Sequence, residues 1–238
     1  MKILALDTSA SPVSAALLSD GELAGEFFLN IKTTHSQTLM PIVDTLLKTT
    51  DTNIDDVDIF AVNAGPGSFT GVRIGVSTIK GLSMPLDKPC ASVSTLESMA
   101  YNMPYFHGIA CCVMDARCSQ IYNALFMLGK GNVERITADR ALSINELLSD
   151  LEYYDDDIYL VGDGASICYN AYSGKLDNII LVPENIRYQR AYGTAKAAER
   201  LACHNGLCTS AALQPLYLRL PQAERELKAK LAQQKSNW

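Results

Sequence analysis

The stretch Gly65–Leu82, GPGSFTGVRIGVSTIKGL, decides the fold of this chain. It follows an apolar run over residues 58–64, short enough to predict one buried strand. The Gly-Pro-Gly break at 65–67 ends that strand, and Ser68 or Thr70 can cap a helix that follows. One face of this predicted helix carries aliphatic side chains: Val72, Val76 and Ile79.

The glycines of this stretch allow two interpretations. A glycine turn from a strand into a helix presents free N–H groups at the positive end of the helix dipole, which favours an anion. However, no Gly-Lys-Ser/Thr closes the turn, and the spacing from Gly65 to Gly71 is one residue too long for a dinucleotide fingerprint. Gly71 and Gly75 lie one helical turn apart, so another helix could approach closely. Close packing is the favoured interpretation, and phosphate binding stays open.

Composition limits the class of protein. The chain has 238 residues, of which 48% are hydrophobic and 19% charged, enough for one large domain or two small ones. A net charge of −6 argues against nucleic-acid binding by the chain itself. The N-terminus shows no signal peptide, and no apolar run is long enough to span a bilayer. The seven cysteines form no CxxC pair, which makes a zinc site unexpected and fits a reducing cytoplasm.

Secondary-structure patterns repeat along the chain. The first half predicts strands over 2–9, 13–19, 22–30, 58–64 and 90–94, and helices over 35–47 and 70–82 and from Thr95 to before Pro104. Pro41 either kinks the first helix or marks its true start. The second half predicts strands over 108–117, 120–128, 133–142, 158–162 and 178–183, a helix opened by the capping box Ser143–Glu146, and an alanine-rich helix over 191–205.

Each half therefore begins with three strands, and the first strand carries an aspartate near its end, Asp7 or Asp115. We interpret this as an internal duplication. The predicted fold class is α/β, with two tandem lobes, each a mixed sheet flanked by helices, facing each other across a cleft. The first lobe would cover 1–103, with the helix over 191–206 packing back on it. A reduced second lobe would cover 104–190, and a tail with a charged helix would follow over 207–238.

Five motifs carry a resemblance to a known family: ALDTS at 5–9, HSQTLMP at 35–41, GPGSFTGVRIG at 65–75, MDAR at 114–117 and QPLYLR at 214–219. With them the chain resembles the TsaB (YeaZ) family, part of the actin-like superfamily of ribonuclease H-like lobes that includes Hsp70 and sugar kinases. The resemblance covers nearly the whole chain and is weakest over 150–190.

The resemblance implies a non-catalytic subunit required for N6-threonylcarbamoyladenosine on tRNAs that read codons beginning with A. The implied partners are the catalytic paralogue TsaD and the ATPase TsaE. A homodimer is implied for the chain alone, tRNA contact only through the complex, and a cytoplasmic location. The helices over 35–47 and 70–82 would form the interface. Its candidate residues are His35, Leu39, Ile42, Val43, Leu46, Phe69, Gly71, Val72, Arg73, Gly75, Val76 and Ile79. The aliphatic ridge could instead pack on its own sheet.

The sequence motif for nucleotide binding is incomplete in this chain. Related ATPases resemble one another in glycine-rich loops after the two first strands, and residues 7–12 and 115–119 contain no glycine here. Weak ATP or ADP binding with Mg would use a remnant site, although no cofactor is expected to be required. Its candidate residues are Asp7, Thr8, Ser9, Asp115, Gly162 and Gly164. Both aspartates could instead cap turns.

Other functions receive less support from the sequence. A small ATP-dependent kinase of the same fold remains the alternative. A metalloprotease is contradicted because His35, His107 and His204 show no i, i+4 spacing, and we expect no catalytic or metal-binding residue. Arg73 and Lys80 share one side of their helix and could contact a partner, a nucleotide or solvent. The tail over 224–234 mixes both signs of charge and predicts a solvated helix, with a tRNA or partner contact left open.

Overall fold

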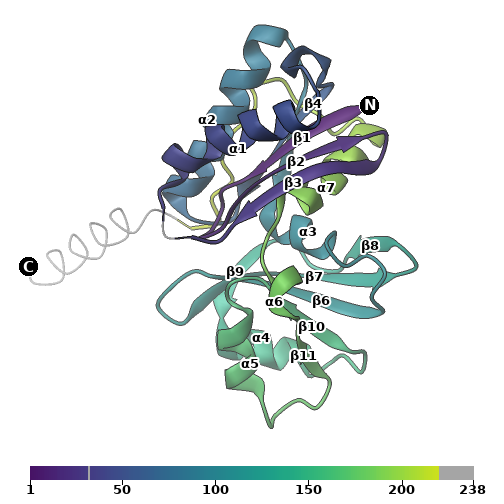
Figure 1. Ribbon diagram of the computed structural model, residues 1–238. Coiled ribbons are helices and arrows are strands. Elements are labelled where there is room, and N and C mark those ends of the chain that lie inside the picture. The colour runs from purple at the N-terminus through teal and green to yellow at the C-terminus, as the bar shows by residue number, and fades with distance from the viewer. Residues whose placement is uncertain (32, 220–238) are drawn as a thin grey trace, which may run out of the picture.

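The computed structural model describes residues 1–31 and 33–219, which form two mixed β-sheets, one in each lobe (Figure 1). The first sheet has the order β3-β2-β1-β4-β5, with β1 (Lys2–Asp7), β2 (Val13–Ser19), β3 (Glu22–Leu29), β4 (Ile59–Gly65) and β5 (Cys90–Ser94). The second has the order β11-β10-β6-β7-β8, with β6 (Gly108–Asp115), β7 (Gln120–Gly129), β8 (Asn132–Arg135), β10 (Ile158–Val161) and β11 (Ile179–Leu181). In both sheets the first strand pairs antiparallel with the strand that follows it, β1 with β2 and β6 with β7, and parallel with a later strand, β1 with β4 and β6 with β10. This confirms the predicted fold class.

The second lobe differs from the prediction in one strand. The strand expected over 133–142 is two strands, β8 and β9 (Arg140–Ser143), and both pair with β7. Between them the backbone N–H groups of Ile136 and Thr137 both donate to the carbonyl oxygen of Leu125, at 2.8 and 3.2 Å. The Thr137 hydroxyl accepts from the Leu125 N–H at 2.9 Å. This side-chain bond replaces one ladder bond, so the strand is interrupted.

Helices cover both faces of the first sheet. On one face lie α1 (His35–Thr49) and α2 (Phe69–Ser83), whose apolar residues pack with Leu4 and Leu6 of β1. On the opposite face lies α7 (Ala191–Cys203), which packs with Ile3 and Ala5. The two sets alternate along β1, as expected for a strand buried on both sides. Pro41 lies inside α1, which begins at His35 rather than near the proline.

The second sheet is also covered on both faces. The apolar side of α3 (Thr95–Ala100) packs against one face, with Leu96 and Met99 beside Cys112. On the other face lie α4 (Ile144–Leu151) and α5 (Ala165–Tyr172), beside Cys111. The predicted capping box opens α4, while α5 and the short α6 (Glu184–Arg187) were not predicted. Two single turns of 3₁₀ helix complete the list, η1 (Ile54–Asp56) and η2 (Met84–Leu86).

Two boundaries differ in detail from the sequence-based division. The helix α3 falls within 1–103 but buries its apolar face on the second sheet. The segment after α7 returns to the first lobe, where Cys208 pairs with Cys90 through two backbone bonds of 2.8 Å and Leu213 is buried. The helix predicted over 224–234 lies outside the described residues. No helix in the described part of the chain is both long and apolar enough to cross a membrane.

The glycines of α2 are required by a close contact with the end of β1. A Cβ atom on Gly71 would collide with the carbonyl oxygen of Thr8, and one on Gly75 would lie 2.5 Å from Thr8 Oγ1 and 3.0 Å from Val62 Cγ2. The Thr8 hydroxyl donates to the carbonyl oxygen of Gly71 at 2.7 Å. Close packing is therefore the correct interpretation, although the element that approaches α2 is a strand end and not another helix.

We expect Gly71→Ala to lower the free energy of unfolding by about 1–3 kcal/mol, because the new methyl group meets backbone that must shift. The matched control is Gly81→Ala in the same helix, where a Cβ atom meets nothing within 4 Å. That change should raise stability by up to about 1 kcal/mol through helix propensity alone. Urea denaturation of both variants measures the difference, and an equal gain in both would show that the contact with Thr8 is loose.

Candidate functional site

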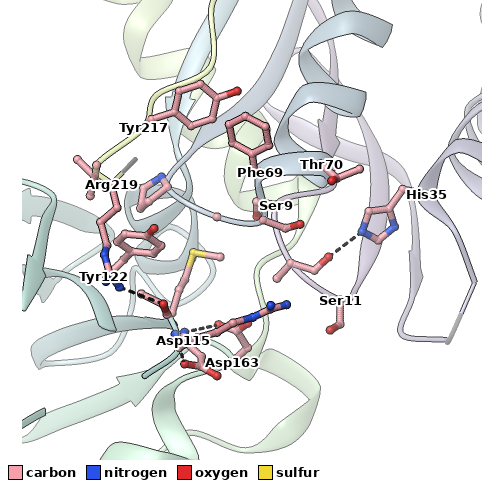
Figure 2. Close-up of a pocket in the computed structure, with 18 of the residues that line it drawn as sticks. Ser9, Ser11, His35, Phe69, Thr70, Asp115, Tyr122, Asp163, Tyr217 and Arg219 are labelled. Atoms are coloured by element: carbon pink, nitrogen blue, oxygen red, sulfur yellow. Dashed lines mark hydrogen bonds between the residues drawn. The ribbon is translucent and has the colours of Figure 1, made fainter. Parts of the chain in front are cut away.

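A cleft of about 860 Å³ lies between the lobes (Figure 2). Its first-lobe wall is formed by the turn after β1 and by the start of α2, and its second-lobe wall by the turn after β6. Segment 216–219, from the end of the described chain, closes one side. The side chains labelled in Figure 2 are Ser9, Ser11, His35, Phe69, Thr70, Asp115, Tyr122, Asp163, Tyr217 and Arg219. Most of them are polar, so the cleft suits a polar occupant better than an apolar one.

The two first-strand aspartates perform the same local task in both lobes. Asp7 Oδ1 accepts from the N–H of Ser9 at 2.8 Å, and Asp115 Oδ1 accepts from the N–H of Arg117 at 2.7 Å. Each bond closes a turn two residues long, which is the structural role that the sequence left open for these aspartates. The same bonds occupy backbone N–H groups that a phosphate at these turns would need.

Four of the six predicted nucleotide-site residues are closed off from the cleft. Asp7, Thr8, Gly162 and Gly164 are buried and do not line it, whereas Ser9 and Asp115 do. A Cβ atom on Gly162 would collide with the carbonyl oxygen of Val113, so that glycine serves packing. At the start of α2, the Ser68 hydroxyl accepts the Gly71 N–H at 3.3 Å, so one N–H group of the first turn already has a partner. These residues do not fit a phosphate chain approaching from the cleft.

Burial raises the pKa of two aspartates near the cleft. Asp7 is 1% exposed, and burial raises its pKa, although hydrogen bonds with Ser9 and Asn63 oppose the shift. Asp163 accepts from the N–H of Asp115 at 3.3 Å, and burial raises its pKa to about 6. The exposed Asp115 carboxylate nearby adds to that rise. The protonation of Asp163 therefore changes in mildly acidic solution.

The predicted interface residues mostly face inward. The aliphatic members of α1 and α2 belong to the core of the first lobe: Leu39, Ile42, Val43, Leu46, Val72, Val76 and Ile79. Gly71 and Gly75 face Thr8, and His35 Nε2 hydrogen-bonds the Ala10 carbonyl oxygen at 2.7 Å. These side chains pack on their own sheet, the alternative left open by the sequence. A surface for a partner on these helices must consist of their exposed residues.

Arg73 and Lys80 contact the chain's own C-terminal segment. The Arg73 guanidinium lies 3.6 Å from the Phe69 ring centroid, and its Nε donates to the Tyr217 hydroxyl at 2.7 Å. Phe69 and Tyr217 stack with ring centroids 5.0 Å apart. Lys80 Nζ lies 3.4 Å from the Ala211 carbonyl oxygen. Sequence reasoning missed Tyr217 as a member of the site, although it lies in the QPLYLR motif.

Comparisons with known proteins agree with this fold. A family model described as "TsaD: tRNA N6-adenosine threonylcarbamoyltransferase" matches residues 27–227. The tRNA threonylcarbamoyladenosine biosynthesis protein TsaB of Bacillus subtilis is 36% identical over 167 residues, which cover 70% of this chain and 73% of that protein. The protein of the same name in Haemophilus influenzae is 28% identical over 92% of this chain and 94% of its own. The solved structure of YeaZ from Pseudomonas aeruginosa superposes with a TM-score of 0.80 at 25% identity, over 91% of this chain and 99% of that one.

The Asp163 carboxyl predicts a specific dependence of stability on pH. Its pKa is about 6 in the folded chain, against an ordinary value of 3.8, so the folded state holds more protons between these values. Stability therefore falls as pH rises through this window. Asp163→Asn removes the effect and keeps an oxygen for the Asp115 N–H. Urea denaturation gives the free energy of unfolding at pH 4 and at pH 7. Its decrease from pH 4 to pH 7 should be smaller by roughly 1–2 kcal/mol in this variant than in the unsubstituted chain.

The control for that measurement is Asp155→Asn, a substitution of an exposed aspartate in the same lobe. This variant should show the same decrease in the free energy of unfolding between pH 4 and pH 7 as the unsubstituted chain. An Asp163→Asn variant that loses as much stability between pH 4 and pH 7 as the unsubstituted chain would contradict the expectation.

Proposed function

The chain belongs to the TsaB family, and we propose that it acts in the cytoplasm as a non-catalytic docking subunit for tRNA N6-threonylcarbamoyladenosine synthesis. In this proposal it binds a TsaD-like paralogue that performs the transfer, together with a TsaE-like ATPase. Without the paralogue it forms a homodimer through the same surface. The family membership supports the pathway, and the arrangement of the first lobe supports the docking role.

The observation that carries the docking role is the pair α1 and α2. They lie side by side on one face of the first sheet, and among the described residues both carry exposed side chains on the side away from that sheet (Figure 1). Their exposed apolar side chains include Met40 of α1, 44% exposed, and Met84 just after α2, 58% exposed. At the cleft, in contrast, Asp7 and Asp115 each accept one N–H group of the turn that follows, and neither turn contains the glycines of a kinase phosphate loop.

The outer row of α2 has room for another helix. Ser77 and Gly81 are exposed, small and four residues apart, and a Cβ atom on Gly81 meets nothing within 4 Å. A row of small residues at this spacing forms a shallow groove. The exposed row of α1, with Met40 and Asp44, supplies bulkier side chains that such a groove can accept. A two-helix surface of about 800 Å² on each partner is the size of a stable interface.

Gly81→Arg tests the docking surface. The substitution fills the groove while keeping the helix, because arginine is a good helix former. We expect the homodimer and the complex with the TsaD-like paralogue to weaken by at least about tenfold, which corresponds to ~1.4 kcal/mol. Sedimentation velocity and isothermal titration measure both associations.

Gly129→Arg is the matched control, since a Cβ atom there also meets nothing within 4 Å, but the residue lies in β7 of the second lobe. It should leave both associations unchanged. If Gly81→Arg binds as tightly as this control, the interface lies on another surface. Substitutions at Val72 or Gly75 cannot serve as this test, because both residues are buried.

A reconstitution experiment tests the role in the pathway. Threonylcarbamoyladenosine formation on tRNA should require this chain in addition to the TsaD-like and TsaE-like proteins and the threonylcarbamoyl donor. The chain alone should neither hydrolyse ATP nor modify tRNA. Modification at full rate without the chain would contradict the docking role, and ATP turnover by the chain alone would favour the kinase alternative.

A further inference from the structure

We propose that segment 213–219, called the latch below, holds the two lobes together at the cleft and sets its width. This inference goes beyond the docking role and does not depend on any partner. The latch runs from the core of the first lobe, past the start of α2, to the turn after β6 in the second lobe. It is therefore an additional contact between lobes that the chain already joins elsewhere.

The first end of the latch is fixed to the first lobe by its backbone. Leu213 is 1% exposed in the first-lobe core. The Leu216 N–H then donates to the Ala64 carbonyl oxygen at 2.7 Å, at the end of β4. Gly65 beside it has φ +130°, and a Cβ atom there would collide with the Leu216 carbonyl oxygen. This close approach explains why a glycine follows Ala64.

The middle of the latch is fixed by the aromatic stack. Tyr217 lies on Phe69, and Arg73 contacts both of them, through its guanidinium over Phe69 and its bond to the Tyr217 hydroxyl. A stacked pair with a cation over one ring is a directional contact between α2 and the latch. Figure 2 shows Tyr217 and Phe69 together on the first-lobe side of the cleft, with Arg219 extending toward the second lobe.

The last residue of the latch reaches the second lobe. Arg219 Nη1 donates to the Ala116 carbonyl oxygen at 3.1 Å. Ala116 opens the turn between β6 and β7, in which Arg117, Cys118 and Ser119 have φ between 54° and 63°. Non-glycine residues adopt this conformation only when their surroundings hold them there. Arg219 is one of the contacts that hold this turn.

The latch lies away from the contacts that join the lobes elsewhere. There α3 packs against α7, with Gly193 touching the Ser98 carbonyl oxygen, and Arg200 donates to the Val133 carbonyl oxygen at 2.9 Å. None of these residues lines the cleft, whereas Leu216, Tyr217 and Arg219 do. An opening motion about this junction separates the lobes more at the cleft than at the junction itself. A contact at the cleft therefore restrains such a motion more effectively than a contact inside the junction.

The test measures the distance between the lobes in the full chain. Nitroxide labels are placed on Asp55→Cys in the first lobe and Asp155→Cys in the second, both exposed and outside the docking surface, after Cys118, Cys203 and Cys208 are replaced by serine. Double electron–electron resonance should give a longer and broader distance distribution with Arg219→Ala or Tyr217→Ala added. Hydrogen exchange of the unlabelled Tyr217→Ala chain should show the Leu216 amide exchanging about tenfold faster, because the latch opens locally.

Gln214→Ala is the matched control, since Gln214 lies in the same segment, is exposed and does not line the cleft. It should leave the distance distribution unchanged, and Tyr217→Phe, which keeps the stack, should change it less than Tyr217→Ala. Circular dichroism and thermal melting confirm that each variant is folded. The proposal is overturned if Arg219→Ala and Tyr217→Ala give the unsubstituted distribution, or if Gln214→Ala widens it equally.

Discussion

The structure depends on the contact between the end of β1 and the start of α2. Backbone and side-chain atoms of Thr8 occupy the space that Cβ atoms on Gly71 and Gly75 would need. The Thr8 hydroxyl fixes the register of this contact by its bond to the Gly71 carbonyl oxygen. Because both elements also form one wall of the cleft, this glycine-mediated packing positions Ser9, Phe69 and the latch relative to one another. The most distinctive stretch of the sequence is thus explained by packing, with no ligand required.

The two lobes share a strand arrangement but differ in the turns that they place at the cleft. The same aspartate turn closes β1 and β6, yet Asp7 is buried while Asp115 is exposed beside Asp163. The first-lobe turn is fixed by α2, and the second-lobe turn receives Arg219 from the latch. In both places a protein group satisfies the backbone N–H that follows the aspartate. This arrangement fits a lobe pair retained for its shape and surface, as proposed for the docking role.

Much of the fold could be predicted from local patterns. Continuous apolar runs indicated β1, β4 and β6, and the capping box of α4 is present as expected. The partner of the aliphatic side of α1 could not be predicted, because helical periodicity finds that side and not the surface it packs against. Leu39 is buried against the sheet of its own lobe, whereas the neighbouring Met40 is exposed. Contacts between distant residues were also out of reach: Tyr217 meets Phe69 through tertiary folding alone, and the Thr137 bond that divides β8 from β9 has no sequence pattern.

The first lobe is assembled from both ends of the chain. One face of its sheet is covered by Ala191, Ala195 and Ala198 of α7. The core on the opposite face of the sheet includes Leu213. The second lobe lies between these segments in the sequence. During synthesis on the ribosome, the second lobe therefore emerges whole while one face of the first sheet is still bare to water. A chain released before residue 191 would expose the apolar face of β1, and such a truncated product should be recognised by chaperones or proteases.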